Sequence, residues 1–254
     1  MIILFFSHCL NGAVLQHRTK LTKNKSQNLV KEEITFEGLK FLYKTKWKSK
    51  DGYEKLSKMS LTLGKDAVPL LLDVMKRSSY PDGNRWIAIF SLTRITGEKS
   101  APVHRKFLKH PNWLMRLGAL RCLNILKDQL AQSEYERLLK DPSILVRKQA
   151  LLNIDQLKLA SSSSKIVLML KDSTNYIQTK NGFSLPTDLI DQVILSLGNL
   201  KHRDVRHEFI KMMQNEQNKK LSYALDYSLE KITGLKSPQG DWKQKKQFWG
   251  SQTL

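Results

Sequence analysis

Apolar side chains recur along most of this chain at the three- and four-residue intervals of an amphipathic helix. The clearest example is a segment written three times, beginning at Arg85, Arg116 and Arg147, so that each copy starts 31 residues after the previous one. In every copy an alanine follows three positions after the arginine, and a leucine or isoleucine follows after seven. A fixed period of about 20 to 50 residues is typical of stacked supersecondary units. The pattern predicts an all-α chain of repeated helix pairs.

The periodicity also predicts where the helices lie. Short first helices are expected at 67–76, 101–109, 133–140, 165–171 and 205–213. Longer helices are expected at 51–64, from 85 to near 97, at 113–126, at 143–157, around 193–198 and at 221–233. Ser133 is predicted to cap its helix, with Glu136 completing a capping box. Pro142 is expected at the first position of its helix, where its missing N–H costs nothing.

The fourth of the repeated second helices arrives late. Leu197 follows Ile154 by 43 residues where the earlier copies are 31 apart, which places about a dozen extra residues within 172–188. Insertions in repeat arrays loop out on one face, often the functional one. Tyr176, Lys180 and Phe183 make this insertion a candidate contact site. A tolerated surface insertion is the alternative, since long loops cost little free energy.

Two of the turns carry a family resemblance. In 111–123 and 142–154 a proline is followed by an apolar residue, arginine and Ala-Leu. This pattern resembles the HEAT repeat, and the short period resembles the compact subtype named after phycobilin lyases. The resemblance covers 51–234 and implies a right-handed α-solenoid, an armadillo/HEAT-like superhelix of about five to six helix pairs. It also implies that Arg116 and Arg147 bond to turns of neighbouring repeats; a row of ligand-contacting arginines is the alternative.

The charge of the chain indicates an anionic partner. Lysine and arginine total 43 against 23 acidic residues, which gives a formal net charge of +20. A field of this size favours anionic partners, among them nucleic acid, acidic glycans, anionic membrane surfaces and acidic proteins. General solubility is the other explanation of the same charge.

The ends of the chain differ from its middle. Residues 1–13 are apolar and end in small residues, and they resemble the hydrophobic part of a secretory signal, although no basic residue precedes them. We therefore expect a leader at 1–15 and export to a bacterial periplasm; a cytoplasmic protein with an apolar terminal segment is the alternative. Residues 16–50 form a basic segment, partly flexible, with a helix or a strand pair in its second half. The solenoid at 51–234 is followed by a Trp/Lys-rich tail at 235–254.

Catalytic motifs are missing from the sequence. It has no glycine-rich phosphate loop, no paired CxxC units and no HExxH helix. The two cysteines, Cys9 and Cys122, provide no disulfide framework. The sequence predicts no catalytic residue, no metal site and no cofactor, and no transmembrane segment in the mature chain.

These observations predict a non-enzymatic scaffold that binds an acidic protein or another anionic partner through its concave face. The alternative is a nucleic-acid-binding HEAT protein, including a DNA glycosylase-like enzyme, because the HEAT-like alkylpurine glycosylases are also basic solenoids with tryptophans. Cations set among aromatic rings suit phosphate binding and base stacking. The candidate partner-binding residues are Arg85, Trp86, Trp113, Arg116, Arg121, Lys127, Arg147, Lys148, Tyr176, Lys180, Phe183, Trp242 and Trp249.

Overall fold

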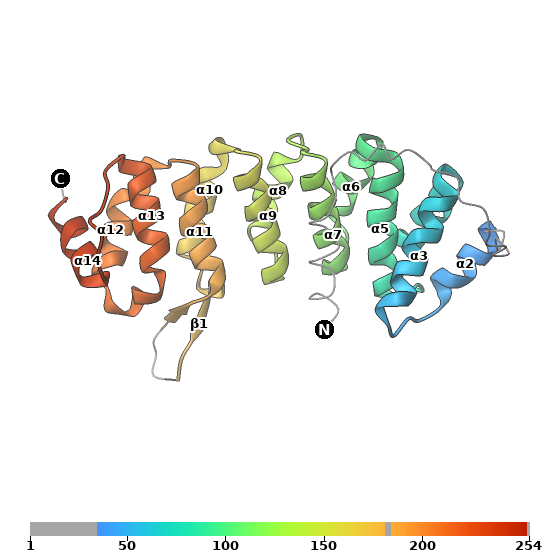
Figure 1. Ribbon diagram of the computed structural model, residues 1–254, viewed down its shortest axis with the longest axis horizontal. Coiled ribbons are helices and arrows are strands. Elements are labelled where there is room, and N and C mark those ends of the chain that lie inside the picture. The colour runs from blue at the N-terminus through green and yellow to red at the C-terminus, as the bar shows by residue number, and fades with distance from the viewer. Residues whose placement is uncertain (1–34, 181–183, 253–254) are drawn as a thin grey trace, which may run out of the picture. The chain divides into compact units, whose positions relative to one another are not determined.

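The computed structural model describes residues 35–180 and 184–252. Helices dominate these residues, and a single short β-hairpin is the only sheet among them (Figure 1). The prediction of an all-α repeat protein is confirmed. The predicted leader at 1–15 and the first part of the basic segment lie outside the described residues. Within the described part of the chain, no helix is both long enough and apolar enough to cross a membrane.

The chain divides into two units, residues 1–100 and residues 101–254. The helices described in the first unit are α2 (Phe36–Lys44), α3 (Lys50–Leu63), α4 (Val68–Lys76) and α5 (Asp82–Thr96), with 3-10 turns η1 (Gly64–Ala67) and η2 (Gly97–Ser100). Helix α5 packs against α3 and α4. The buried Asn84 amide donates to the carbonyl oxygens of Tyr43 at 2.6 Å and Thr45 at 2.8 Å, which fixes the end of α2. The second half of the basic segment is therefore a helix, not a strand pair.

The second unit alternates short first helices with longer second helices. The first helices are α6 (Ala101–Phe107), α8 (Gln132–Leu138), α10 (Ser163–Val167) and α12 (Arg206–Gln214). The second helices are α7 (Trp113–Ile125), α9 (Ile144–Gln156), α11 (Asp188–Asn199) and α13 (Ser222–Thr233). Short 3-10 turns connect them: η3 (Ala160–Ser162), η4 (Leu168–Leu170), η5 (Ser173–Asn175), η6 (Arg203–Val205) and η7 (Glu216–Leu221). Consecutive second helices stand side by side and pack on one another (Figure 1).

The repeated apolar residues form the core of this unit. Ala119, Ala150, Leu123 and Ile154 are fully buried, as their spacing predicts. Small residues let neighbouring helices approach closely, and the larger side chains one turn later fill the remaining space. Gly198 serves the same purpose between α11 and α13, because a Cβ atom there would lie only 2.5 Å from the Ser228 Oγ.

The predicted insertion is a β-hairpin. Strand β1 (Tyr176–Gln178) pairs antiparallel with β2 (Ser184–Pro186), and Ile177 lies opposite Leu185. The hairpin projects from the unit beside the start of α11 (Figure 1). Both Ile177 and Leu185 are exposed, so the hairpin adds an apolar pair to the surface.

The tail packs on the repeat array, which corrects the prediction that Trp249 is free for a partner. It forms α14 (Trp242–Ser251), which begins with a capping box of Asp241 and Gln244 and packs on α12. Trp249 is fully buried, and its Nε1 donates to Asp226 Oδ1 at 2.7 Å. The last pair of a repeat array would otherwise expose an apolar face, and a terminal cap removes that exposure.

Two predicted helix starts are wrong. The N-cap of α8 is Ala131, so Ser133 lies inside the helix and makes no capping box. Glu136 accepts hydrogen bonds from Gln132 and Ser162 instead. Pro142 precedes the N-cap of α9, because Asp141 Oδ1 accepts from the Ser143 N–H at 2.9 Å and forms a turn before the helix begins.

Three second helices end in a left-handed lysine. Lys127, Lys158 and Lys201 have φ values of 53°, 57° and 53°, whereas α13 ends in Gly234 with φ 79°. The next N–H bonds to the carbonyl five residues back, as from His202 to Leu197 at 3.0 Å, which is a Schellman motif. A side chain with a Cβ costs about 1 kcal/mol in this conformation relative to glycine. A cation at a helix C-terminus offsets part of that cost.

Replacing Lys201 separates strain from charge. Lys201→Gly should raise the free energy of unfolding by about 0.5–1 kcal/mol, because glycine adopts the left-handed conformation freely, and should raise Tm by about 2–4 °C. Lys201→Ala removes the same charge but keeps the Cβ, so it should give no increase. Thermal and urea unfolding measure both variants; equal stability of the glycine and alanine variants would contradict this account.

Candidate partner-binding face

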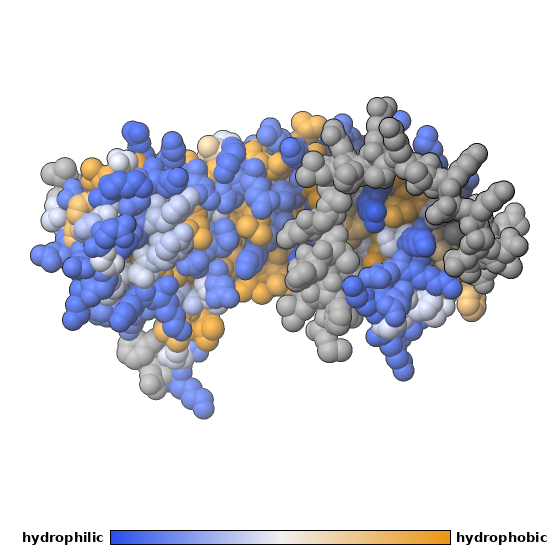
Figure 2. Space-filling model, viewed as in Figure 1, coloured by the Kyte–Doolittle hydropathy of each residue, from blue (hydrophilic) through white to orange (hydrophobic). Residues whose placement is uncertain are grey.

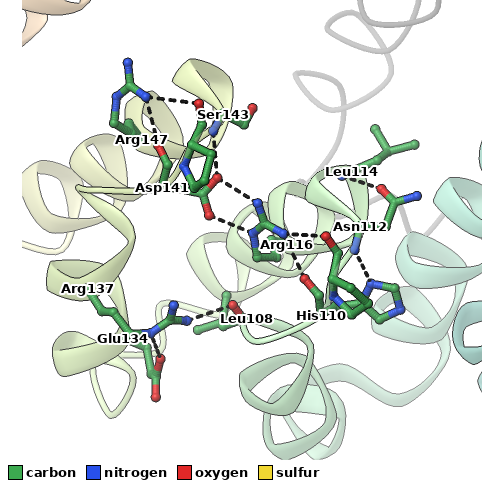
Figure 3. Close-up of polar contacts among 12 residues, drawn as sticks. Leu108, His110, Asn112, Leu114, Arg116, Glu134, Arg137, Asp141, Ser143 and Arg147 are labelled. Carbon is green, nitrogen blue, oxygen red and sulfur yellow. Dashed lines mark hydrogen bonds and ion pairs between the residues drawn. The ribbon is translucent and has the colours of Figure 1, made fainter. Parts of the chain in front are cut away.

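The repeated arginines act inside the array. Arg116 donates from Nε and Nη2 to the Asp141 carboxylate of the next turn at 2.7 and 2.8 Å (Figure 3). Its Nη1 donates to the carbonyl oxygens of His110 at 2.9 Å and Pro111 at 2.8 Å in its own turn. One guanidinium therefore joins two consecutive turns, with the two-pronged geometry that makes arginine–carboxylate pairs strong.

Arg147 repeats this arrangement one unit later, with carbonyl oxygens in place of the carboxylate. It is 5% exposed. Its Nη1 donates to the Asp141 carbonyl at 2.8 Å, Nε to Asn175 Oδ1 at 2.9 Å and Nη2 to the Thr174 carbonyl at 3.1 Å. The side chain thus fixes the residues from which the hairpin starts.

The first helices are joined in a similar way. Arg137 on α8 donates from Nη2 to the carbonyl oxygen of Leu108, just after α6, at 2.9 Å (Figure 3). Its Nε donates to Glu134 at 2.7 Å. Arginine therefore links successive repeats in both rows of helices.

Several predicted contact residues are therefore structural. In the first unit, Arg85 is 1% exposed and donates to the Met75 carbonyl and to Asp82. Trp86 is also buried and lies against Phe90, with ring centroids 5.0 Å apart. Arg116 and Arg147 are engaged by turns, as the resemblance implies. The prediction that Arg85, Trp86, Arg147 and Trp249 contact a partner is wrong, because their side chains fill the protein interior.

Other predicted residues remain on the surface of the second unit. Lys127 and Lys180 are exposed, and Trp113 is 38% exposed at the start of α7. Half-buried residues are Arg121, Lys148, Tyr176 and Trp242. Tyr176 is anchored, because its hydroxyl donates to the Leu170 carbonyl at 2.7 Å. Phe183 lies outside the described residues.

A face built by the second helices brings some of these residues together. Arg121 Nε donates to Gln149 Oε1 at 3.3 Å, which links α7 to α9. The Tyr227 hydroxyl donates to Asn199 Oδ1 at 3.2 Å, which links α13 to α11. Arg121 and Tyr227 occupy equivalent repeat positions, each two residues before a buried core leucine, Leu123 or Leu229. They therefore mark the same side of the row of second helices, here called the second-helix face. Figure 2 shows apolar side chains gathered over α9 on this side of the unit.

The most distinctive group on this face is one that the sequence interpretation missed. Tyr223 is 72% exposed and stacks on Tyr227, with ring centroids 6.2 Å apart. Lys231 Nζ lies 5.3 Å from the centroid of the Tyr227 ring. The spacing of 223, 227 and 231 is a signal in the sequence, because residues four apart share one helix face. The repeat pattern does not point to this spacing, because the last unit, which contains these three residues, matches the repeat weakly.

The face carries mixed charge. Burial raises the pKa of Asp191, the neighbouring Asp188 raises it further, and Lys148 opposes the shift. Arg121, Lys148 and Lys231 supply positive charge to the same surface. The face therefore presents a pattern of both charge signs rather than a uniform positive field.

Metal chemistry finds no support in the described residues. They contain no group of three or more His, Cys, Asp or Glu side chains that could hold a metal ion. His104 is fully buried, and burial lowers its pKa to about 4, so its ring is neutral at pH 7. Cys122 is a buried thiol within α7.

Comparison with known proteins agrees with this architecture. The model of the HEAT-repeat family matches residues 68–155. These residues are therefore similar to HEAT repeats. The solved complex of CpcE and CpcF of phycocyanin lyase from Nostoc sp. PCC7120 is similar at 14% sequence identity and a TM-score of 0.44, over 93% of this chain and 100% of that chain. No curated protein matches the chain significantly.

The role of the arginines in these HEAT repeats can be measured. Arg147→Ala should lower the free energy of unfolding by about 3 kcal/mol, because it leaves several buried oxygens without a donor. The next residue, Lys148, is half-buried and is the control. Lys148→Ala should change the free energy of unfolding by no more than about 0.5 kcal/mol. Urea unfolding gives both values. A loss below about 1 kcal/mol for Arg147→Ala would contradict an internal role.

Proposed function

We propose that this chain is a non-enzymatic HEAT-repeat scaffold that binds a protein partner through the second-helix face of its second unit. The observation that carries this proposal is the solvent-exposed stack of Tyr223 on Tyr227, with Lys231 beside it. A tyrosine that is 72% exposed yet held by a neighbouring ring is a large contact surface in a fixed position.

Such side chains suit protein recognition for energetic reasons. Tyrosine offers a broad apolar ring and a hydroxyl group at a small cost in rotamer entropy. Tyrosine and arginine are also enriched among the residues that dominate binding energy. The second-helix face presents Tyr223 and Tyr227 on α13 and Arg121 on α7, so affinity can be spread along the array.

The charge of the chain supports an acidic partner. Besides the cations on the face, Lys127, Lys158 and Lys201 are exposed at the ends of three consecutive second helices. With a net charge of +20, the protein attracts anionic surfaces from solution. The acids Asp188 and Asp191 then restrict which acidic surfaces fit.

Nucleic acid is the weaker candidate. Base stacking needs accessible aromatic rings among cations, yet Trp86 and Trp249 are buried. Arg116 and Arg147, which had been candidates for phosphate contacts, bond to turns instead. Among the described residues of the second unit, Tyr223 and Trp113 are the exposed aromatic rings that a nucleic acid would have to use.

Site-specific cross-linking tests the proposal. A photoreactive p-benzoylphenylalanine in place of Tyr223 should give a cross-link to a discrete protein in cells of the source organism. The same residue in place of Lys211, which is exposed on α12 in the other row of helices, is the matched control and should give none.

The captured protein then allows a quantitative test. Tyr223→Ala should weaken binding of the captured protein by about 30-fold or more, which is the effect of losing a dominant contact. The free energy of unfolding should change by no more than about 0.5 kcal/mol. Equal cross-linking from both positions, or cross-linking from position 223 to nucleic acid, would contradict the proposal.

A further inference from the structure

The first unit contains an open cleft that the second-helix face does not involve. Its volume is about 780 Å³, and it is lined by α2, by α4 and by the turn that follows α4. Leu70, Pro69 and Tyr80 form its apolar lining, and Phe36 borders it from α2. Leu70 and Tyr80 are buried, whereas Phe36 is 38% exposed. The cleft is large enough for an apolar side chain together with the polar groups around it.

Cations surround the apolar lining. Lys40 and Lys44 line the cleft from α2, one helical turn apart, and Arg77 lines it from the end of α4. Lys44 has no ion pair among the described residues, and Lys40 makes only a 3.6 Å contact with the exposed Glu37. These two ammonium groups are therefore available to a ligand.

Among the described residues that line the cleft, Asp73 is the one carboxylate, and it is already engaged. Asp73 Oδ1 accepts from Arg77 Nε at 2.5 Å, and Oδ2 accepts from the Tyr80 hydroxyl at 3.1 Å. The Arg77 charge neutralises Asp73, so the remaining lysines give the cleft a net positive charge. Burial raises the pKa of Tyr80, and the hydrogen bond to Asp73 raises it further, so the hydroxyl keeps its proton and holds Asp73 in place.

We propose that this cleft binds an acidic peptide segment of a partner protein, with an apolar side chain on the lining and carboxylates on Lys40 and Lys44. A simple anion would leave the apolar lining exposed, and a purely apolar ligand would leave the cations unpaired. Both features are satisfied by acidic residues that flank an aromatic or branched side chain.

Charge also argues against residues of the chain's own amino terminus as the occupant. Residues 1–34 contain five lysine and arginine residues against two glutamates, so they carry positive charge themselves. Like charges disfavour that segment beside the lysines of α2. An acidic segment of another protein is the complementary ligand. This inference does not rest on the proposed role of the second-helix face, and each can fail without the other.

Binding of a labelled peptide to the full chain tests the cleft. The probe is fluorescein-labelled Glu-Glu-Phe-Leu-Glu-Glu, measured by fluorescence anisotropy at fixed salt. Replacing its glutamates by lysine, or its Phe-Leu by Ser-Ser, should abolish binding. The double variant Lys40→Glu, Lys44→Glu should bind the original peptide at least about tenfold more weakly.

The matched control is Lys46→Glu with Lys48→Glu. Both residues are exposed, follow α2 directly and do not line the cleft, so the net charge changes equally. This control should alter the affinity by no more than about twofold. If the Lys40/Lys44 pair variant fails to fold by circular dichroism, Lys44→Glu alone should still weaken binding severalfold. Equal losses in the two pair variants, or no peptide binding at millimolar concentration, would overturn the proposal.

Discussion

The second unit depends on one interaction, the arginine that joins the turns of consecutive repeats. Stacking helix pairs buries the turns between them, and buried carbonyl oxygens need hydrogen-bond donors. A guanidinium offers several donors in one plane, so a single side chain can serve two turns at once. Arg116 does this with a carboxylate partner, and Arg147 does it with carbonyl oxygens alone.

Where the arginine is missing, close packing takes over its role. The positions equivalent to Arg147 in α11 and α13 are Ile190 and Ser222. There the helices approach through Gly198, and the Ser228 hydroxyl donates to the Ile194 carbonyl at 2.9 Å. The periodic residues are therefore committed to architecture. The residues proposed to bind a partner lie at positions that differ between repeats. One equivalent surface position holds Lys148 on α9, Asp191 on α11 and Tyr223 on α13.

The features that could be predicted from the sequence are those set by the apolar periodicity. The helix pairs, the buried alanines and the place of the insertion all follow from apolar spacing and a constant repeat length. The internal role of Arg116 and Arg147 was implied by the family resemblance. Trp249 was misjudged because a tryptophan among lysines in a short final segment reads as surface; its burial depends on Asp226, 23 residues earlier, which spacing does not reveal. The cleft in the first unit depends similarly on residues distant in sequence, because Lys40 on α2 and Arg77 at the end of α4 line the same space.

The most direct test of the account is a double-mutant cycle on Arg116 and Asp141. Urea unfolding of Arg116→Met, Asp141→Asn and the combined variant isolates the energy that couples the two turns, because Asn keeps the turn acceptor for Ser143. The account predicts a coupling energy of at least about 1 kcal/mol, since the pair is two-pronged and largely buried. A coupling energy near zero, with the single effects simply additive, would contradict the view that this arginine joins the repeats.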